Sequence, residues 1–341
     1  MSVKKISEQR LDDWVNELIE ESPVLGVQQK DDHFEWDNLA RASDLRLDYD
    51  VSLTPPGKVA FQPPRETLMR FDGVEYEPVW RDEPFTLFGV HPYDMVAINQ
   101  MDEIFSMNKC DDHYLTPRES ATIVACDVQT PSDDVFAGYL DNHRVEEGFD
   151  VLLTKLADGY LVDIRTEKGE QLAESLSEEP EASEADLEAR RQVWEDNEDK
   201  LKQHELRAMP DEWPDLLREG HEHPVWKDMA EKCFSCGSCN TSCPTCYCFD
   251  VQEDVDWDLE SGERARVWDG CLLEKFARVA GDHNFRGEKH ERYRHRYYRK
   301  GLYVPDMIGE CACVGCGRCI NVCVSNIANP VEVFNRLSEE E

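Results

Sequence analysis

The sequence predicts an α+β protein in three parts: an N-terminal mixed α/β domain (1–165), an acidic helical connector (166–225) and a cysteine-rich C-terminal domain (226–341). Strand and helix patterns alternate in the first part. The second is rich in Glu, Ala, Leu, Lys and Arg, and in the third Cys, Gly and aromatic residues become frequent. The 341 residues are enough for two or three domains, each with its own core.

Five patterns predict the elements of the N-terminal domain. Apolar residues at three-and-four spacing predict an amphipathic helix over 8–21. A strand at 85–90 leads into a helical pattern over 95–105, and a second strand follows at 121–125. This order predicts a βαβ unit within a mixed sheet, and 150–164 is predicted to form a β-hairpin.

The chain is strongly acidic, with a net charge of -36. Residues 231–341 carry 14 Lys and Arg against 19 Asp and Glu (-5), which leaves 23 against 54 (-31) for residues 1–230. Such a surplus repels nucleic acid and anionic membranes, and no apolar run approaches the roughly 18 residues of a membrane span. We therefore expect no nucleic-acid partner and no membrane span. The acidic connector is expected to be helical and exposed, with local disorder as the alternative.

Fourteen cysteines are present, and eight of them form two copies of the run C-x2-C-x2-C-x3-C. This is the ligand run of bacterial-type ferredoxins, in which the fourth cysteine of each run binds the neighbouring [4Fe-4S] cluster. The first cluster is therefore assigned to Cys233, Cys236, Cys239 and Cys323. The second cluster is assigned to Cys313, Cys316, Cys319 and Cys243. A chain with these two clusters is expected to transfer electrons.

Small residues inside each run fit this interpretation, because they let the backbone curl and turn its N–H groups toward the sulfur atoms. These residues are Gly237, Ser238, Gly315 and Gly317. The fourth cysteine of each run is expected to begin a helix that points away from its own cluster.

Two other uses of these cysteines are disfavoured. C-x2-C pairs also occur in structural zinc sites, but zinc takes four ligands per site and has no use for the regular third and fourth cysteines of each run. A disulfide framework does not suit a chain of this length without a signal peptide. We therefore expect reduced cysteines and a cytoplasmic location.

Six cysteines lie outside the two runs. Cys110 and Cys126 are expected to be ordinary surface or core thiols. The other four are enough for a third cluster, although small buried cysteines packed around the first two clusters would look the same in the sequence. They are Cys246, Cys248, Cys271 and Cys311.

The insertion between the two runs, residues 244–312, is far longer than in a minimal ferredoxin. It is predicted to contain a helical stretch over 272–280, followed by a basic run over 292–300. Cations interleaved with aromatics would in isolation suit single-stranded nucleic acid, which the surrounding acid disfavours. Two interpretations remain open. The cations lie near the anionic clusters and raise their potential, or they form a solvated face of a helix or strand.

The chain lacks the motifs of a self-sufficient enzyme. There is no G-x-G-x-x-G after a strand, no G-x4-G-K-[ST] and no H-E-x-x-H. No catalytic residue and no NAD, flavin or ATP site is therefore predicted. Two linked clusters without a substrate or nucleotide motif indicate an electron relay.

Longer segments around the cysteines resemble one family, the iron-sulfur dicluster family of sulfhydrogenase beta subunits and anaerobic sulfite reductase A subunits. In the C-terminal domain the resemblance lies in Cys243–Val251, Trp268–Cys271, His283–Arg286 and Cys313–Cys319. In the N-terminal domain it lies in Leu87–Asp94 and Glu147–Leu153. The resemblance covers about two thirds of the chain.

The resemblance implies a subunit that performs no chemistry on a substrate itself. Its relatives join a flavoprotein that exchanges hydride with a pyridine nucleotide, and pass single electrons to a NiFe hydrogenase or another reductase. A NiFe hydrogenase partner is the first expectation. An anaerobic sulfite reductase or a heterodisulfide-reductase type of complex is the alternative.

The sequence departs from the family pattern in two places. Val324 follows Cys323, where a ferredoxin run ends in proline. Relatives also often carry cysteines at four N-terminal positions that have other residues here, namely Tyr93, Val128, Val135 and Ala137. If those cysteines hold an extra cluster in relatives, the resemblance implies that this chain has lost it and that its N-terminal domain is a docking module.

Two further functions remain as rivals. One is an enzyme whose own substrate-reducing cluster is built from Cys246, Cys248, Cys271 and Cys311. The other is a structural scaffold whose clusters only hold the fold.

Overall fold

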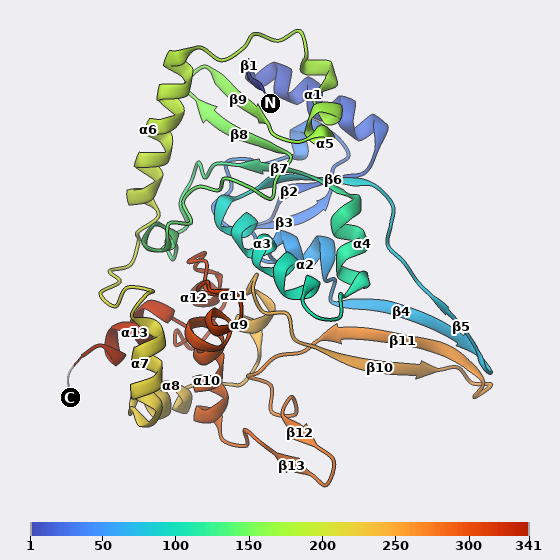
Figure 1. Ribbon diagram of the computed structural model, residues 1–341, viewed down its shortest axis with the longest axis vertical. Helices are drawn as coiled ribbons and strands as arrows, with labels where there is room; N and C mark the ends of the chain where they lie inside the picture. The colour runs from blue at the N-terminus through green and yellow to red at the C-terminus, as the bar shows by residue number, and fades with distance from the viewer. Residues whose placement is uncertain (1, 340–341) are drawn as a thin grey trace.

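The computed structural model describes residues 2–339, and a seven-stranded mixed sheet forms the upper part of the molecule in Figure 1. Its strand order is β1-β9-β8-β7-β6-β2-β3. The strands are β1 (Ser2–Ile6), β2 (Val24–Lys30), β3 (His33–Asn38), β6 (Phe85–Val90), β7 (Ala121–Cys126), β8 (Val151–Leu156) and β9 (Gly159–Ile164).

The four central strands, β2, β6, β7 and β8, run parallel to one another. Antiparallel strands flank them, with β3 on one side and β9 and β1 on the other. The predicted βαβ unit is confirmed, because β6 and β7 are parallel neighbours joined through helices. The hairpin predicted over 150–164 is also confirmed as β8 and β9.

Helices cover both faces of this sheet. They are α1 (Glu8–Glu21), α2 (Pro56–Phe61), α3 (Pro92–Ser106), α4 (Asp112–Ser120) and α5 (Glu167–Leu172). On one face, the apolar side of α1 packs with Phe88 and Val124. On the other face, α2, α3 and α4 pack with Leu87 and Ile123. Because neighbouring residues of a strand point to opposite faces, both layers are built from the same strands. The amphipathic helix predicted over 8–21 is confirmed with the same bounds.

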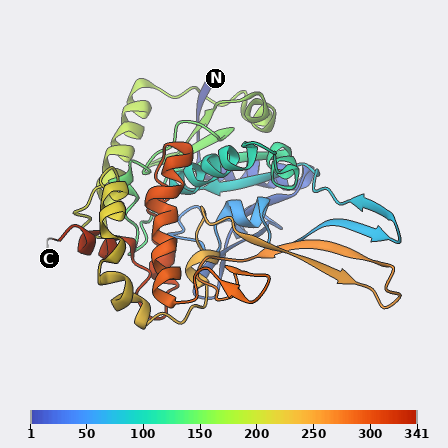
Figure 2. The same cartoon turned by 60° about the horizontal axis from the view of Figure 1, so that its bottom comes forward.

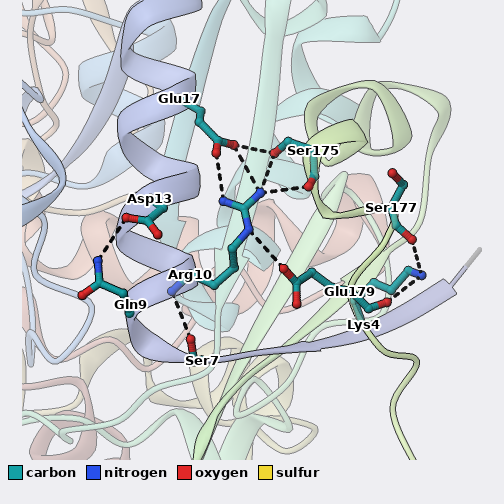
Figure 3. Close-up of polar contacts among 9 residues, drawn as sticks. All are labelled: Lys4, Ser7, Gln9, Arg10, Asp13, Glu17, Ser175, Ser177 and Glu179. Carbon is teal, nitrogen blue, oxygen red and sulfur yellow. Dashed lines mark hydrogen bonds and ion pairs between the residues drawn. The ribbon is translucent and has the colours of Figure 1, made fainter.

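The first part of the connector is fastened to the N-terminal strand and helix (Figure 3). Arg10 donates to Glu179 at 3.2 Å, to Glu17 at 3.0 Å and to the carbonyl of Ser175 at 2.8 Å. Lys4 donates to the carbonyls of Ser177 and Glu179 at 2.9 and 3.1 Å. The helix that follows, α6 (Glu184–Lys200), leads down toward the cysteine-rich part (Figure 1). The connector is therefore ordered here rather than free.

The helices of the cysteine-rich part and of the segment just before it are short. They are α7 (Trp213–Glu219), α8 (Val225–Glu231), α9 (Ser238–Thr241), α10 (Lys289–Tyr298), α11 (Pro305–Ile308), α12 (Arg318–Asn321) and α13 (Pro330–Leu337). Short 3-10 turns lie at Ala42–Asp44, Ala137–Leu140, Glu174–Leu176 and Gly220–Glu222, and a π-helical turn lies at Arg299–Tyr303. The helix predicted over 272–280 is wrong, because this stretch forms turns that end in a small hairpin of β12 (Arg278–Val279) and β13 (His283–Asn284). No helix within residues 2–339 is long and apolar enough to cross a membrane.

A second sheet joins two segments that lie far apart in the sequence. Strands β4 (Arg65–Asp72) and β5 (Glu75–Pro78) come from the N-terminal part, and β10 (Phe249–Val255) and β11 (Ser261–Trp268) come from the insertion between the cysteine runs. They form one antiparallel sheet in the order β10-β11-β4-β5. We call this sheet the arm, because it projects from the body in Figures 1 and 2.

A buried ion pair joins the N-terminal sheet layer to the second cysteine run. Arg318 donates to both carboxylate oxygens of Asp94 at 2.6 Å, and both side chains are buried. Arg318 also donates to the carbonyl and the hydroxyl of Ser52 at 2.7 and 3.0 Å. Burial raises the pKa of Asp94, which Arg318 opposes. A charge removed from this pair would leave its partner buried and unpaired.

We expect Asp94→Ala to lower the free energy of unfolding by about 3–5 kcal/mol, because Arg318 would then be an uncompensated buried cation. The measurement is urea denaturation of the anaerobic protein, followed by tryptophan fluorescence. The control is Arg41→Ala, which removes an exposed pair with Asp44 and should cost less than about 1 kcal/mol. Equal costs for the two variants would contradict a structural role for the Asp94 pair.

Candidate functional site

The two cysteine runs fold into two similar loops, each followed by a one-turn helix. Gly237 precedes α9 and Gly317 precedes α12, with φ of 78° and 76°. This left-handed region favours glycine, so the expected role of these two residues holds. The expected helix is misplaced, however. The third cysteine of each run lies inside the short helix and the fourth comes after its end, because the chain must turn back toward the neighbouring loop.

Backbone N–H groups turn toward two of the sulfur atoms, as the small residues in the runs predict. The N–H of Ser235 donates to Cys233 Sγ at 3.3 Å, and that of Ile327 donates to Cys323 Sγ at 3.4 Å. Ser235 takes a φ of 54° to reach this position. Such N–H groups stabilise negative charge on the sulfur atoms.

The first set of predicted ligands lines one cavity. Its lining includes all four assigned cysteines, Cys233, Cys236, Cys239 and Cys323. Three come from the first run and the fourth comes from the second, which is the exchange expected of a two-cluster ferredoxin. Cys236 is exposed, so this cavity lies at the molecular surface.

None of the second set of predicted ligands is exposed. Burial raises the pKa of Cys316 to about 12, and the nearby charges of Cys243 and Cys319 contribute to the rise. Burial also raises the pKa of Cys313, again with contributions from Cys319 and Cys243. The charges of Cys243, from the first run, and Cys319, from the second, therefore act on both Cys313 and Cys316.

Three of the four remaining cysteines line a separate cavity. Cys246, Cys248 and Cys271 meet there, and the amide of Asn240 donates to the sulfur atoms of Cys246 and Cys271 at 3.6 and 3.5 Å. Cys311 is absent from this lining and instead contacts the carbonyl of Lys300 at 3.8 Å. The structure thus brings together three of these cysteines rather than four. Cys110 is exposed and Cys126 is buried in the sheet layer, as expected of ordinary thiols.

The basic run forms α10 and the turn after it, and one face of this segment is directed at the cysteines. Arg292, Arg296 and Lys300 recur every four residues, so they share a face, and all three are buried. We call them the cation row. Arg292 donates to the hydroxyl of Ser235 at 3.4 Å, beside the first loop. Arg296 donates to the carbonyl of Cys239 at 3.0 Å, and Lys300 to that of Thr245 at 3.0 Å. The row therefore extends from the first set of cysteines to the second.

Sequence reasoning missed a fourth buried cation at this site. Lys58, in α2 of the N-terminal part, donates to the carbonyls of Asn240 and Thr241 at 3.0 and 3.1 Å. Burial lowers the pKa of Lys58, while the thiols of Cys246 and Cys243 act in the opposite direction. No motif marks this lysine, since its role depends on the packing of α2 against the first cysteine loop.

The buried cations indicate that the group held by the cysteines is an anion. Within residues 2–339, none of Lys58, Arg296 and Lys300 forms an ion pair with a carboxylate, and all three are bonded to backbone carbonyls. An uncompensated buried charge costs several kcal/mol. Burial alone would lower the pKa of Arg296, yet the Cys239 and Cys319 thiolates raise it well above its usual range. A [4Fe-4S] cluster with four thiolate ligands carries negative charge, so the donor set and the cations both fit it.

The N-terminal positions where relatives often carry cysteines also gather at this site. Tyr93, Val128, Val135 and Ala137 belong to one apolar cluster that includes Cys316. The backbone of Ala137 lies so close to Gly315 that an added Cβ would come within 2.6 Å of it. These four positions therefore lie beside the second set of ligands and are filled here by apolar packing.

Comparisons with known proteins agree with this geometry. A family model described as a 4Fe-4S dicluster domain matches residues 232–327. The chain is 32% identical over 340 residues to sulfhydrogenase 2 subunit beta of Pyrococcus furiosus, and the match covers 99% of each protein. These findings identify the cysteine-rich part as an iron-sulfur domain.

We expect Cys239→Ala and Cys319→Ala each to remove about four iron and four sulfide per chain, because each variant deletes one ligand of one cluster. Iron and acid-labile sulfide would be measured on anaerobically purified protein. Cys110→Ala, a change at an exposed thiol outside both runs, should retain the full content. Full content in either ligand variant would refute its assignment.

We expect Arg296→Met to lower the reduction potential of at least one cluster by tens of millivolts, because a nearby positive charge stabilises the reduced, more negative form. The measurement is a redox titration followed by electron paramagnetic resonance.

Arg294→Met is the matched control for this prediction. Arg294 lies on the same helix but points away, donating to the carbonyl of His221 at 2.9 Å. Its removal should leave the potentials within a few millivolts of wild type. Equal shifts in the two variants would contradict a specific effect of the cation row.

Proposed function

Because the chain belongs to the family of sulfhydrogenase beta subunits, we propose that it relays single electrons between a flavoprotein subunit that handles NAD(P)H and a NiFe catalytic subunit. The family and its iron-sulfur domain indicate an electron-transfer subunit of a hydrogenase-type complex. A bound [4Fe-4S] cluster takes up and releases one electron, which is the chemistry that this function needs.

One observation carries the proposal: the cation row lies against both sets of cysteines. We propose that Cys233, Cys236, Cys239 and Cys323 hold the first cluster, and that Cys313, Cys316, Cys319 and Cys243 hold the second. Arg296 contacts both sets: it donates to the carbonyl of Cys239 at 3.0 Å, and its hydrogen bond to the Cys319 thiol partly offsets the rise that burial causes in the pKa of Cys319. A shared cation stabilises added negative charge at either site and so raises both potentials.

We propose the first cluster site as the place where electrons pass to or from another subunit. The site opens to the surface at Cys236, which is exposed. Phe234 and Val324 line the same cavity and are 73% and 87% exposed. A second subunit that covers these side chains would exclude water and come near the cluster. None of the second set of ligands is exposed, since Cys243, Cys316 and Cys319 are buried and Cys313 is half-buried.

A third cluster is the second candidate, and the cavity lined by Cys246, Cys248 and Cys271 favours it. Arg299 and Lys300 line the same cavity, so an anionic group there would be compensated. The three cysteines of this cavity can bind three of the four iron atoms of a cubane, so one iron would have no thiolate from them. A substrate-reducing cluster would also need one iron without a thiolate ligand. This candidate and the two-cluster relay differ in iron content.

We further propose that residues 1–165 serve in assembly and that 166–225 is a connector between this part and the cluster domain over 226–341. The observation in support is that the N-terminal layer positions the second cysteine run through Asp94 and Arg318.

The test uses the complex purified anaerobically from its host. We expect about eight iron and eight sulfide in this chain, and reduction of its clusters by NAD(P)H only when the flavoprotein subunit is present. About twelve iron would favour the third cluster. Clusters that stay oxidised in the complete complex under NAD(P)H and hydrogen would contradict the relay.

A further inference from the structure

The arm projects from the body of the molecule instead of folding back on it. Its two hairpins come from residues 65–78 and 249–268 and are held together by the pairing of β4 with β11. In both views it extends away from the sheet layer and from the cysteine loops (Figures 1 and 2). At its far end, the N–H of Gly73 donates to the carbonyl of Glu260 at 2.9 Å, so the two end loops form one tip.

The tip of the arm exposes large apolar side chains. Trp257 is fully exposed, Val74 is 95% exposed and Leu259 is 80% exposed. Single exposed apolar residues are common on protein surfaces, but a group at the end of a projection marks an interaction site more often than chance. Tryptophan is also the residue most enriched among those that dominate binding energy.

The apolar surface continues from the tip along one face of the arm. Val255, Gly262, Phe71 and Tyr76 lie opposite one another on the four strands, and residues paired in this way point to the same face. Gly262 leaves room for the ring of Phe71, since an added Cβ would lie 2.7 Å from it. Tyr76 and Val255 are 74% and 53% exposed. One face of the arm is therefore apolar across its width.

The loop that presents Trp257 is rigid. The carboxylate of Asp258 accepts from the N–H groups of Glu260 and Ser261, both at 2.9 Å. Asp256 accepts from the hydroxyl of Ser261 at 2.9 Å. Leu259 is held with a φ of 61°, a conformation that costs free energy for a residue with a side chain. A loop that is ordered before binding loses less conformational entropy when it docks.

The arm is also strongly acidic. Its two segments carry eleven carboxylates and four arginines, a net charge of -7. Within residues 2–339, six of these carboxylates near the tip have no ion-pair partner; they are Asp72, Glu75, Glu77, Asp256, Asp258 and Glu260. Glu75 and Glu260 directly follow the exposed Val74 and Leu259 in the sequence. The complementary surface is therefore an apolar depression with lysine or arginine at its border.

We propose that the arm is a docking element that inserts its apolar tip into such a basic-rimmed depression on another subunit of the complex. A second copy of this chain is disfavoured as the occupant, because two arms of charge -7 would repel each other. The inference rests on the proposed function only in that the partner is a subunit of the same complex. It adds the surface by which this chain is held and the chemistry of the surface that receives it.

The test measures the dissociation constant for binding of this chain to the other subunits. Those subunits are purified as a complex that lacks this chain. Trp257→Ser combined with Leu259→Ser should raise the constant at least tenfold, because both side chains would be removed from the centre of the interface. Glu75→Lys combined with Glu260→Lys should also raise it, and this effect should shrink as the salt concentration rises.

Val279→Ser is the control, since Val279 is 47% exposed on the separate hairpin of β12 and β13. It should leave the dissociation constant within twofold of wild type. Iron content and the circular dichroism spectrum verify that each variant is folded and loaded.

Two results would overturn the proposal. One is a constant within twofold of wild type for Trp257→Ser with Leu259→Ser. The other is a wild-type dimer of this chain that the same variant converts to a monomer. Reduction of the clusters by NAD(P)H in the wild-type complex tests the proposed function separately. If NAD(P)H reduces the clusters of the wild-type complex normally but the tip variant binds with an unchanged dissociation constant, only the arm proposal is overturned.

Discussion

Positive charge buried without carboxylate partners is the constraint on which the C-terminal half depends. Arg296 and Lys300 lie on the face of α10 and its following turn that is directed at the cysteines, and Lys58 reaches the same region from α2. Their cost in free energy is offset only if an anion is present. The two sets of four cysteines supply that anion when they hold clusters. The same charges that stabilise the folded, loaded state also favour electron uptake, so stability and redox chemistry have one physical origin.

The N-terminal layer takes part in this site rather than standing beside it. Arg318, between the second and third cysteines of the second run, is paired with Asp94 of α3. The N–H of Phe136 donates to the carbonyl of Gly315 at 2.8 Å, which holds the second cysteine loop against the N-terminal layer. Lys58 contributes from α2, which lies on the same face of the sheet as α3. The pairing of β4 with β11 ties the two halves together a third time. The arm thus leaves the body from a region that is rigidly connected to the clusters, which suits a docking element in an electron-transfer subunit.

The sequence predicted the features that depend on local spacing. The cysteine runs, α1, the strands β6 and β7 and the hairpin of β8 and β9 all follow from patterns within a few residues of one another. The arm was not predictable, because β4 pairs with a strand almost 200 residues away, and neither hairpin alone indicates its partner. The helix predicted over 272–280 failed because Leu272 and Leu273 face the first cysteine loop, where packing overrides their helical spacing. The boundaries at 165 and 225 stay predictions.

The dependence of α10 on the clusters is tested most directly by hydrogen exchange in the loaded protein and in protein stripped of iron under reducing conditions. If the buried cations require the anionic clusters, the backbone amides of α10 should lose most of their protection from exchange when iron is removed. Without the clusters, Arg296 and Lys300 would be unpaired buried charges, which favours exposure of the helix to solvent. The amides of β6 and β7, far from these charges, should keep theirs. Unchanged protection of α10 in the iron-free protein would contradict the account.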